Sequence, residues 1–222
     1  MTEAPESRSA RKERTRRAIL DATLAAADQG SLATVSLRHV AGAAGIVPTG
    51  FYRHFASLDE VGLALVDESF GSLRQMLRDV RRGTPEIGGV ISGSVAILVQ
   101  HAHRQEAHFR FIARERVSGP PAVRETIRHG LELFERELAT DLARLPRSGS
   151  WSTDDLWIMA HLIVTVMVST AEDVLDAPRE RPEREREIVA TAEQQLRMIV
   201  VGAAHWESRA DRAPDGQAGT IR

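Results

Sequence analysis

The 222 residues suffice for one domain of ordinary size or for a small domain beside a larger one, and their net charge is −2. The absence of cysteine excludes disulfides, thiolate nucleophiles and cysteine metal sites, and it fits a reducing compartment. The sequence shows no secretory signal and no run of roughly 18 apolar residues, so we expect a cytoplasmic protein without a membrane-spanning segment.

Positive charge gathers at the N-terminal end, although the whole chain is slightly acidic. Residues 1–54 carry 8 basic and 5 acidic side chains, against 21 basic and 26 acidic side chains in residues 55–222. Within ten positions lie Arg8, Arg11, Lys12, Arg14, Arg16 and Arg17. Such a run is commonly a solvated arm, and it indicates nucleic-acid binding only when an element that reads a groove follows it.

Helical periodicity organises the N-terminal quarter. Apolar residues recur at helical spacing over about residues 9–29, and Gly30 stands where a left-handed C-terminal cap belongs. Ser36 is a typical N-cap for a short helix that ends at Gly45. The apolar stripe of that helix is formed by Leu37, Val40, Ala41 and Ala44.

Further helices fill the rest of the chain, and no segment shows the alternation of a strand. The pattern Ser57-Leu-Asp-Glu60 is typical of a capping box and predicts a long helix to about residue 82. After a break at residues 83–89, we expect helices at about 85–103, 106–117, 121–144, 153–175 and 182–207, bounded by Pro, Gly or a capping Ser or Thr. The predicted fold class is therefore all-α.

The segment from Pro48 to Phe55 contains the only tyrosine of the chain, together with two phenylalanines, an arginine and a histidine. On an ideal helix, at about 100° per residue, Phe51 and Phe55 fall within about 40° of each other and define the buried direction. Arg53 then points away from the core. This geometry predicts that the two phenylalanines anchor the segment and that its other side faces outward.

The outward side of this segment is small in the middle and has hydrogen-bonding groups at both edges. Thr49 and Gly50 flank Arg53, while Tyr52 and His54 stand at roughly 80° on either side of the buried direction. A helix that enters a major groove about 12 Å wide needs this profile, because its edges must reach the sugar-phosphate backbone on each wall.

The preceding helix supports the same interpretation. Ala41 puts a small side chain where two helices can cross closely, and Gly45 stands four residues later where the chain must turn sharply. A helix, a tight glycine turn and a second helix form a helix-turn-helix. The alternative is an aromatic staple between two helices of a bundle, which accounts for the phenylalanines but not for the outward polar side chains.

Residues 11–70 resemble the TetR family of bacterial one-component repressors, whose three-helix DNA-binding module ends in a pattern like Gly-Ile-x-x-x-x-x-Tyr-x-x-Phe. Five runs are similar to the FabR-like branch, repressors of unsaturated fatty acid synthesis: residues 36–41, 44–55, 59–69, 109–117 and 134–142. The resemblance implies a homodimeric repressor without enzymatic activity or cofactor, which binds an inverted-repeat operator in double-stranded DNA.

The resemblance also implies roles for individual residues. Arg38 matches the base-reading arginine of the family and His54 a phosphate contact, but Leu58 replaces a frequent lysine. Backbone anchoring there would come from the Ser57 hydroxyl, from helix-terminal amides or from the basic arm. The expected DNA-binding residues are Lys12, Ser36, Arg38, Pro48, Thr49, Gly50, Tyr52, Arg53, His54 and Ser57.

The domain boundaries follow from these elements. We expect a disordered arm at 1–8, a helix-turn-helix domain at 9–56, a connecting helix at 57–84, a ligand-binding and dimerisation domain at 85–207 and a disordered tail at 208–222. The apolar stretch from Leu156 to Ala171 contains His161 and is too short to span a membrane. We interpret it as a buried helix that is covered in part by a second copy of the chain.

The resemblance implies that the C-terminal domain binds an effector, which for the FabR-like branch is a long-chain acyl thioester on coenzyme A or acyl carrier protein. Candidate effector-binding residues are Phe109, Ile112, Phe134, Trp157, His161 and Met167, with Arg104 near the mouth of the cavity. The same residues also fit an ordinary core or dimer contacts. A drug or another small apolar ligand is the alternative effector.

A protein of a different class remains as a further alternative: a helical metal-binding or enzymatic bundle with a degenerate helix-turn-helix. His101 and His108 share a helix face if their helix is continuous, and His103 and Glu106 lie between them. The run from His103 to Ala107, however, is typical of a helix boundary. No serine stands in the context of a nucleophile motif. We therefore expect neither a metal site nor a catalytic site.

Overall fold

The structure, a computed structural model, describes residues 7–81, 87–144, 151–206 and 208, and the regular elements in these ranges are helical. The predicted all-α class is confirmed by this architecture and by its match to solved structures described below. Most of the predicted N-terminal arm (residues 1–6), most of the break at 83–89 (residues 82–86) and residues 209–222 of the predicted tail lie outside the described residues.

The N-terminal domain contains three helices and a short 3-10 turn. They are α1 (Arg8–Asp28), η1 (Leu32–Thr34), α2 (Leu37–Ala43) and α3 (Pro48–Phe51). Ser7 caps α1 by accepting a hydrogen bond from the Ala10 amide at 3.1 Å, so the helix starts one residue before the predicted domain boundary. The sequence patterns did not predict η1.

Two local predictions in this domain were wrong. Gly30 does not have the left-handed conformation expected of it, since Gly45 is the one glycine with positive φ in the described chain. Instead, an arginine of the C-terminal domain, Arg114, donates to the carbonyl of Ala27 at the end of α1. The regular part of α3 is also shorter than residues 48–55, because the chain continues in tight turns to Phe55, whose amide donates to the Phe51 carbonyl at 3.2 Å.

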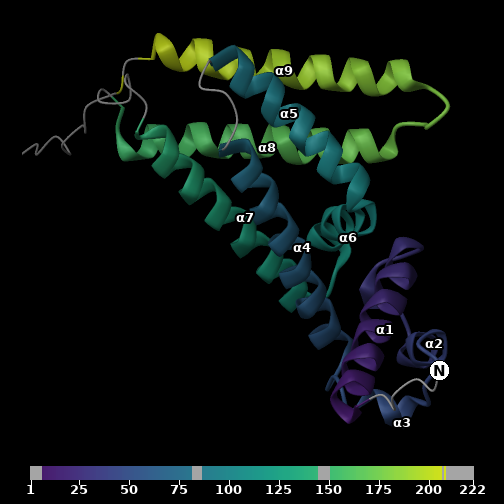
Figure 1. Ribbon diagram of the computed structural model, residues 1–222. Helices are drawn as coiled ribbons and strands as arrows, with labels where there is room; N and C mark the ends of the chain where they lie inside the picture. The colour runs from purple at the N-terminus through teal and green to yellow at the C-terminus, as the bar shows by residue number, and fades with distance from the viewer. Residues whose placement is uncertain (1–6, 82–86, 145–150, 207, 209–222) are drawn as a thin grey trace, which may run out of the picture.

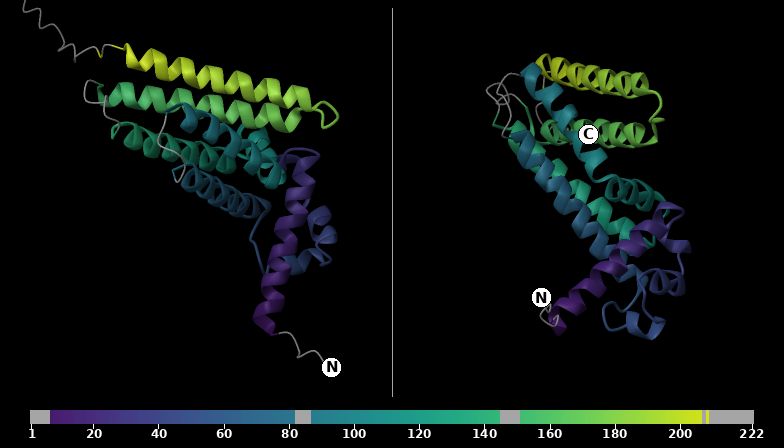
Figure 2. Two further views of the ribbon diagram at one scale, coloured as in Figure 1. Left: turned by 45° about the horizontal axis from the view of Figure 1, so that its top comes forward. Right: turned by 45° about the vertical axis from the view of Figure 1, so that its right-hand side comes forward.

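The C-terminal part of the chain forms six helices at the predicted positions. They are α4 (Leu58–Arg81), α5 (Ile87–Arg104), α6 (Glu106–Ser118), α7 (Pro121–Leu142), α8 (Thr153–Asp176) and α9 (Pro182–Ala204). Helices α8 and α9 run antiparallel side by side at the end of the molecule remote from α1–α3 (Figures 1 and 2). Helices α4 and α7 run from that end toward the N-terminal domain, and α6 lies next to α1 (Figure 1).

One apolar core joins the N-terminal domain to α4, α6 and α7. Phe70 of α4 packs on Phe134 of α7 with ring centroids 5.4 Å apart. At the junction the helices approach so closely that a Cβ at Gly62 would lie 2.4 Å from Leu32 and 2.9 Å from Val123. Any side chain at position 62 would therefore push α4 away from η1 and α7.

Helix α8 is partly buried by this chain, and the cover predicted from a second copy stays a prediction. Met159, Ala160, Ala171 and neighbouring residues are buried, but Trp157, Ile158 and Leu162 are 46–52% exposed. Within the described residues, α8 is the one helix with the length and apolar composition of a membrane span, and 33% of its apolar window is buried. It packs against α5, α6, α7 and α9, so one side of α8 belongs to the core of the helical bundle.

Candidate nucleic-acid interface

Helix α2 and the turn after it are fixed by local hydrogen bonds and by two small buried residues. Ser36 accepts a hydrogen bond from the His39 amide at 3.2 Å, as expected of an N-cap. Val40 and Ala41 are fully buried, so the side of α2 that faces the core carries small side chains. Gly45, with φ of 71°, turns the chain, and the Ile46 amide donates to the Ala41 carbonyl at 2.9 Å. The result is a helix, a tight turn and a second helix.

The anchoring of α3 follows the predicted pattern. Phe51 is 0% exposed and Phe55 is 3% exposed, and their ring centroids lie 6.1 Å apart. Tyr52, which is 62% exposed, packs edge-on against Phe51 with centroids 5.7 Å apart. The buried phenyl ring therefore fixes the position of the tyrosine, whose hydroxyl end is free to contact a ligand outside the protein.

The predicted DNA-binding residues all lie at or near the surface of the N-terminal domain. Exposed residues are Lys12, Ser36, Arg38, Pro48, Thr49, Tyr52, Arg53 and Ser57, while Gly50 and His54 are half-buried. A Cβ added at Gly50 would have its nearest neighbours at 3.8 Å, so no other part of the described chain presses on this face. Ser57 is also used locally, because its hydroxyl accepts the Glu60 amide at 3.2 Å at the start of α4.

The basic stretch of α1 is divided between side chains that contact other parts of the chain and side chains that face solvent. The guanidinium of Arg16 lies over the Phe55 ring, 4.4 Å from its centroid, and joins α1 to the end of the α3 segment. Arg17 instead pairs with Asp21 at 2.6 Å and with Glu68 of α4 at 2.9 Å. The side chains of Arg8, Arg11 and Lys12 are exposed. Only part of the predicted basic run is therefore available to an anionic partner.

His54 stands at the centre of the remaining positive charge. Burial lowers the pKa of His54, and the nearby cations Lys12, Arg16 and Arg53 lower it further, while Glu13 opposes them. The Nδ1 atom of the ring is buried and has no hydrogen-bond partner in the described part of the chain. The local electrostatic field is thus suited to an anion.

The N-terminal domain is attached to α6 by two adjacent charged residues, which sequence reasoning missed. Glu115 is 0% exposed and accepts the Leu32 amide at 2.9 Å, and the Ser31 hydroxyl lies 3.2 Å from its carboxylate and 2.7 Å from the Ser118 carbonyl. Arg114 donates to the last turn of α1, at the Ala27 carbonyl. A negative carboxylate thus lies at the amino end of η1, and a positive guanidinium lies at the carboxyl end of α1. Each charge is opposite in sign to the partial charge of the helix end that it contacts. We call this arrangement the α6 clamp.

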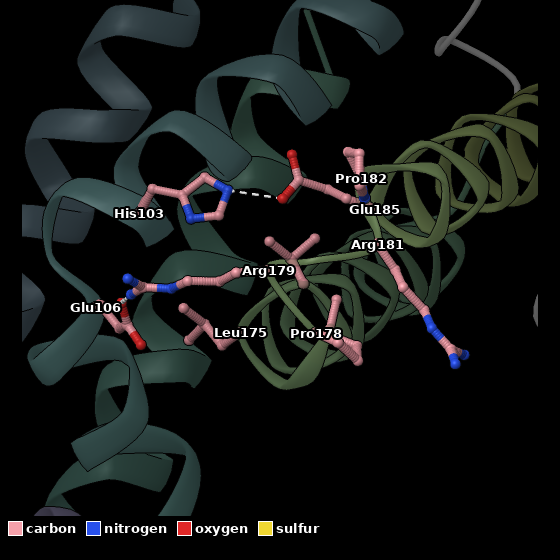
Figure 3. Close-up of a pocket in the computed structure, with 10 residues that line it drawn as sticks. His103, Glu106, Leu175, Pro178, Arg179, Arg181, Pro182 and Glu185 are labelled. Atoms are coloured by element: carbon pink, nitrogen blue, oxygen red, sulfur yellow. Dashed lines mark hydrogen bonds and ion pairs between the residues drawn. The ribbon is translucent and has the colours of Figure 1, made fainter.

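The other end of α6 is held by the turn between α8 and α9. Arg110 contacts Glu106 at 3.0 Å, Asp176 at 3.2 Å and the Leu175 carbonyl, and Arg179 contacts Glu106 at 2.6 Å. Glu106, Leu175 and Arg179 line a pocket of about 280 Å³, across which His103 reaches Glu185 at 2.8 Å (Figure 3). Arg181 points away from the pocket (Figure 3). Helix α6 is therefore fixed at both ends.

The predicted effector-binding residues do not meet in one cavity. Phe109 and Met167 pack in one apolar cluster with Met76, Leu98 and Ala171. Ile112 and Phe134 belong to the core that reaches the N-terminal domain. Trp157 and His161 stack on the outer side of α8 with centroids 5.8 Å apart, and Arg104 is exposed at the end of α5. None of them lines the pocket in Figure 3 or the more open pocket of about 590 Å³ beside Arg116 and Arg128.

The histidines considered as metal ligands point to different partners. His103 pairs with Glu185, and His108 shares a hydrogen bond of 3.0 Å with Ser69 of α4. His101 is buried. The predicted helix boundary between them is confirmed, since α5 ends at Arg104 and α6 begins at Glu106. In the described ranges no group of three or more His, Asp or Glu side chains is arranged to hold a metal ion.

The fold is similar to that of solved TetR-family regulators. No family model matches the sequence.

A TetR family transcriptional regulator from Chloroflexus aurantiacus superposes with a TM-score of 0.60 at 18% identity, over 83% of this chain and 93% of that chain. The fatty acid degradation regulator FadR from Bacillus halodurans has a TM-score of 0.63 at 13% identity, over 90% and 98% of the two chains. The MbdR regulator from Azoarcus has a TM-score of 0.62 at 11% identity, over 82% and 96%. These identities establish a shared fold.

Proposed function

We propose that this chain is a DNA-binding transcriptional repressor that acts as a homodimer on an inverted-repeat operator and responds to a small-molecule effector. The observation that carries the proposal is the outward face of α3 and the turns after it: Phe51 and Phe55 are buried, while Tyr52 and Arg53 remain exposed, as does Arg38 of α2. In this proposal α3 enters the major groove, Arg38 reads a guanine edge, and Tyr52 and Lys12 contact phosphates.

A second copy of the chain is the proposed cover for the outer side of α8 and α9. Ile158 and Leu162 are one helical turn apart on α8, and Met198 and Val201 form a similar pair on α9. All four are 47–68% exposed in the single chain. A twofold axis beside this helix pair would pack four helices together, and it would present two copies of α3 to one side of a duplex.

We expect Leu162→Asp to convert the dimer into a monomer, because a carboxylate cannot be buried in an apolar interface without a partner. The variant should have the mass of a single chain, 24.4 kDa, in light scattering, and it should bind a two-half-site operator at least about 100-fold more weakly. The operator is obtained beforehand by selecting bound sequences from random duplexes with the wild-type protein.

Val117→Asp is the matched control, since Val117 is 68% exposed at the end of α6 and lies outside the proposed interface. This control should remain dimeric and bind the operator normally. A dimeric Leu162→Asp protein, or a wild-type chain that selects no DNA sequence, would contradict the proposal.

The finer proposal is that the repressor controls genes of fatty acid or lipid metabolism and answers a long-chain acyl thioester. It is supported by the resemblance of residues 109–117 and 134–142 to the FabR-like branch and by the apolar cluster around Phe109 and Met167 between α4, α5, α6 and α8. The likeness to FadR concerns the fold, and FadR's link to fatty acid degradation belongs to that protein. A drug or another small apolar ligand is the second candidate.

Titration of saturated and unsaturated long-chain acyl-CoA into the protein–operator complex tests the effector. We expect at least one of them to change the operator affinity by about 5- to 150-fold, the usual range of allosteric coupling. Coenzyme A without an acyl chain is the control and should have no effect. If neither acyl-CoA changes the affinity, the lipid assignment is wrong and the repressor assignment is untouched.

A further inference from the structure

Val47 is an exposed apolar side chain at the start of α3, and none of the proposed DNA contacts uses it. It is 66% exposed. Among the described residues of the N-terminal domain, Val47 and Tyr52 are the large hydrophobic side chains that lie mostly in solvent. A single exposed valine is ordinary on a protein surface, so its place in the fold must carry any argument about its role.

Val47 occupies a position at which helices favour a different kind of residue. In the described N-terminal domain, α1, η1 and α2 each start after a serine, and the hydroxyls of Ser7, Ser31 and Ser36 accept an amide of the first turn. Val47 has the same extended backbone, with φ of −76° and ψ of 151°, but its side chain makes no such bond to α3. Serine stabilises a helix start relative to valine. A residue that departs from such a local rule is a candidate for a functional role.

The side chain of Val47 lies on the same side of α3 as Gly50. The two residues are three apart, and a Cβ added at Gly50 would lie 3.8 Å from the Cγ2 atom of Val47. Because Gly50 carries no side chain, that methyl group is the apolar surface at this point. Its neighbours Pro48 and Thr49 are exposed as well. A group outside the protein can therefore reach the methyl groups of Val47 without an obstacle from α3.

The major groove offers one kind of partner for an apolar side chain at this place. A recognition helix contacts base edges with its N-terminal residues, and Val47 stands at that end of α3. Base edges in the major groove carry hydrogen-bond donors and acceptors, and their apolar group is the C5-methyl of thymine. A valine placed against a donor or an acceptor would remove it from water without a hydrogen bond, which is unfavourable. Thymine is therefore the base whose edge matches Val47.

We propose that Val47 is a specificity-determining residue that packs against the C5-methyl group of a thymine in each half-site of the operator. This inference rests on the proposed function. It goes beyond that function because it fixes the chemistry of one base pair, which must be A·T with the thymine methyl group facing the start of α3. The polar residues of the interface then read the neighbouring base edges and the phosphates.

The test uses the operator selected by the wild-type protein, with deoxyuridine in place of thymine at one position at a time, symmetrically in both half-sites. Deoxyuridine pairs like thymine and lacks only the C5-methyl group. At one position we expect the wild-type Kd to rise by about 4-fold for each half-site, the contribution of one buried methyl group, and so by about 15-fold for the duplex. Fluorescence anisotropy at constant ionic strength measures the Kd.

Val47→Ser removes both methyl groups and supplies a hydroxyl that can cap α3. The variant should therefore unfold in urea at the same denaturant concentration as wild type or at a higher one. At the sensitive position its Kd for the thymine and deoxyuridine duplexes should differ by less than about 2-fold. Val117→Ser makes the same change at a valine that is 68% exposed at the end of α6, and it should keep the full wild-type loss.

The outcomes separate this inference from the proposed function. If deoxyuridine has no effect on the wild-type Kd at any position, Val47 reads no thymine and the inference is overturned. If Val47→Ser shows the same loss as wild type at the sensitive position, another residue contacts the methyl group and the inference is overturned as well. In both cases the repressor proposal stands. If the wild-type chain selects no DNA sequence, the proposed function fails and the inference with it.

Discussion

Arg38→Ala is expected to weaken operator binding by about 1–3 kcal/mol for each half-site, because a bidentate guanidinium contact to a guanine edge is lost. The effect doubles in a dimer, so the Kd of a symmetric operator should rise by a factor of about 30 or more. Arg38 is exposed on α2 and no structural hydrogen bond or ion pair of the described chain is assigned to it. Its removal should therefore leave the unfolding midpoint unchanged, which circular dichroism measures.

Tyr52→Ala tests the second half of the same prediction. Tyr52 is 62% exposed and touches Phe51 only through its ring edge, so truncation should cost operator affinity and little stability. Tyr52→Phe is the matched control: it keeps the contact with Phe51 and loses only the hydroxyl. If Tyr52→Phe binds the operator like wild type, the hydroxyl is not a phosphate contact. If Arg38→Ala and Tyr52→Ala both lose their fold, these residues are structural and the interface proposed on α2 and α3 is wrong.

Glu115→Ala is expected to destabilise the protein by about 3 kcal/mol, because it removes the acceptor of the buried Leu32 amide and empties a fully buried position at the domain junction. The side chain is 0% exposed and accepts the Leu32 amide at the start of η1, while the Ser31 hydroxyl, 3.2 Å from the carboxylate, has a closer acceptor in the Ser118 carbonyl at 2.7 Å. Without it, the buried Leu32 amide has no acceptor. Urea unfolding followed by circular dichroism measures the loss.

Glu115→Gln separates the hydrogen bonds from the rest of the side chain. The amide oxygen of glutamine can still accept the Leu32 N–H, so this variant should lose about half as much stability as Glu115→Ala or less. Glu125, an exposed glutamate of α7, provides the control Glu125→Ala, which should unfold at nearly the same urea concentration as wild type. A loss below about 1 kcal/mol in Glu115→Ala would show that the α6 clamp does not stabilise the junction.

Much of the fold could be predicted because helix boundaries are local. Ser36, Ser57 and Gly45 are read from their immediate neighbours, and the structure uses each at a helix end or turn. The burial of Phe51 and Phe55 was predictable for the same reason, since their spacing of four residues fixes a common side of one helical segment. The prediction of a left-handed cap at Gly30 was wrong because a carbonyl at the end of α1, that of Ala27, accepts a hydrogen bond from Arg114, which is 87 residues away in sequence.

The effector residues and the α6 clamp could not be predicted from helical periodicity. Periodicity identifies an apolar side of a helix, but it does not say whether that side meets the core, a ligand or a second chain. Trp157 and Ile112 have the same apolar character, yet the first is 46% exposed and the second 8%. Glu115 lies in a charged run that resembles a solvated surface, and its burial depends on the Leu32 amide, 83 residues away in sequence.

Because α6 is held at both ends, it connects the turn between α8 and α9 mechanically to the N-terminal helices. Arg110 joins its first turns to the carboxyl end of α8, Arg114 joins its last turns to the last turn of α1, and Glu115 joins them to the start of η1. Since a helix resists compression along its axis, we expect a displacement of the α8–α9 turn to move α1, α2 and α3 together and to leave the packing among them intact. In the proposed dimer, the distance between the α8–α9 turns of the two subunits would then set the spacing of the half-sites to which the dimer can bind.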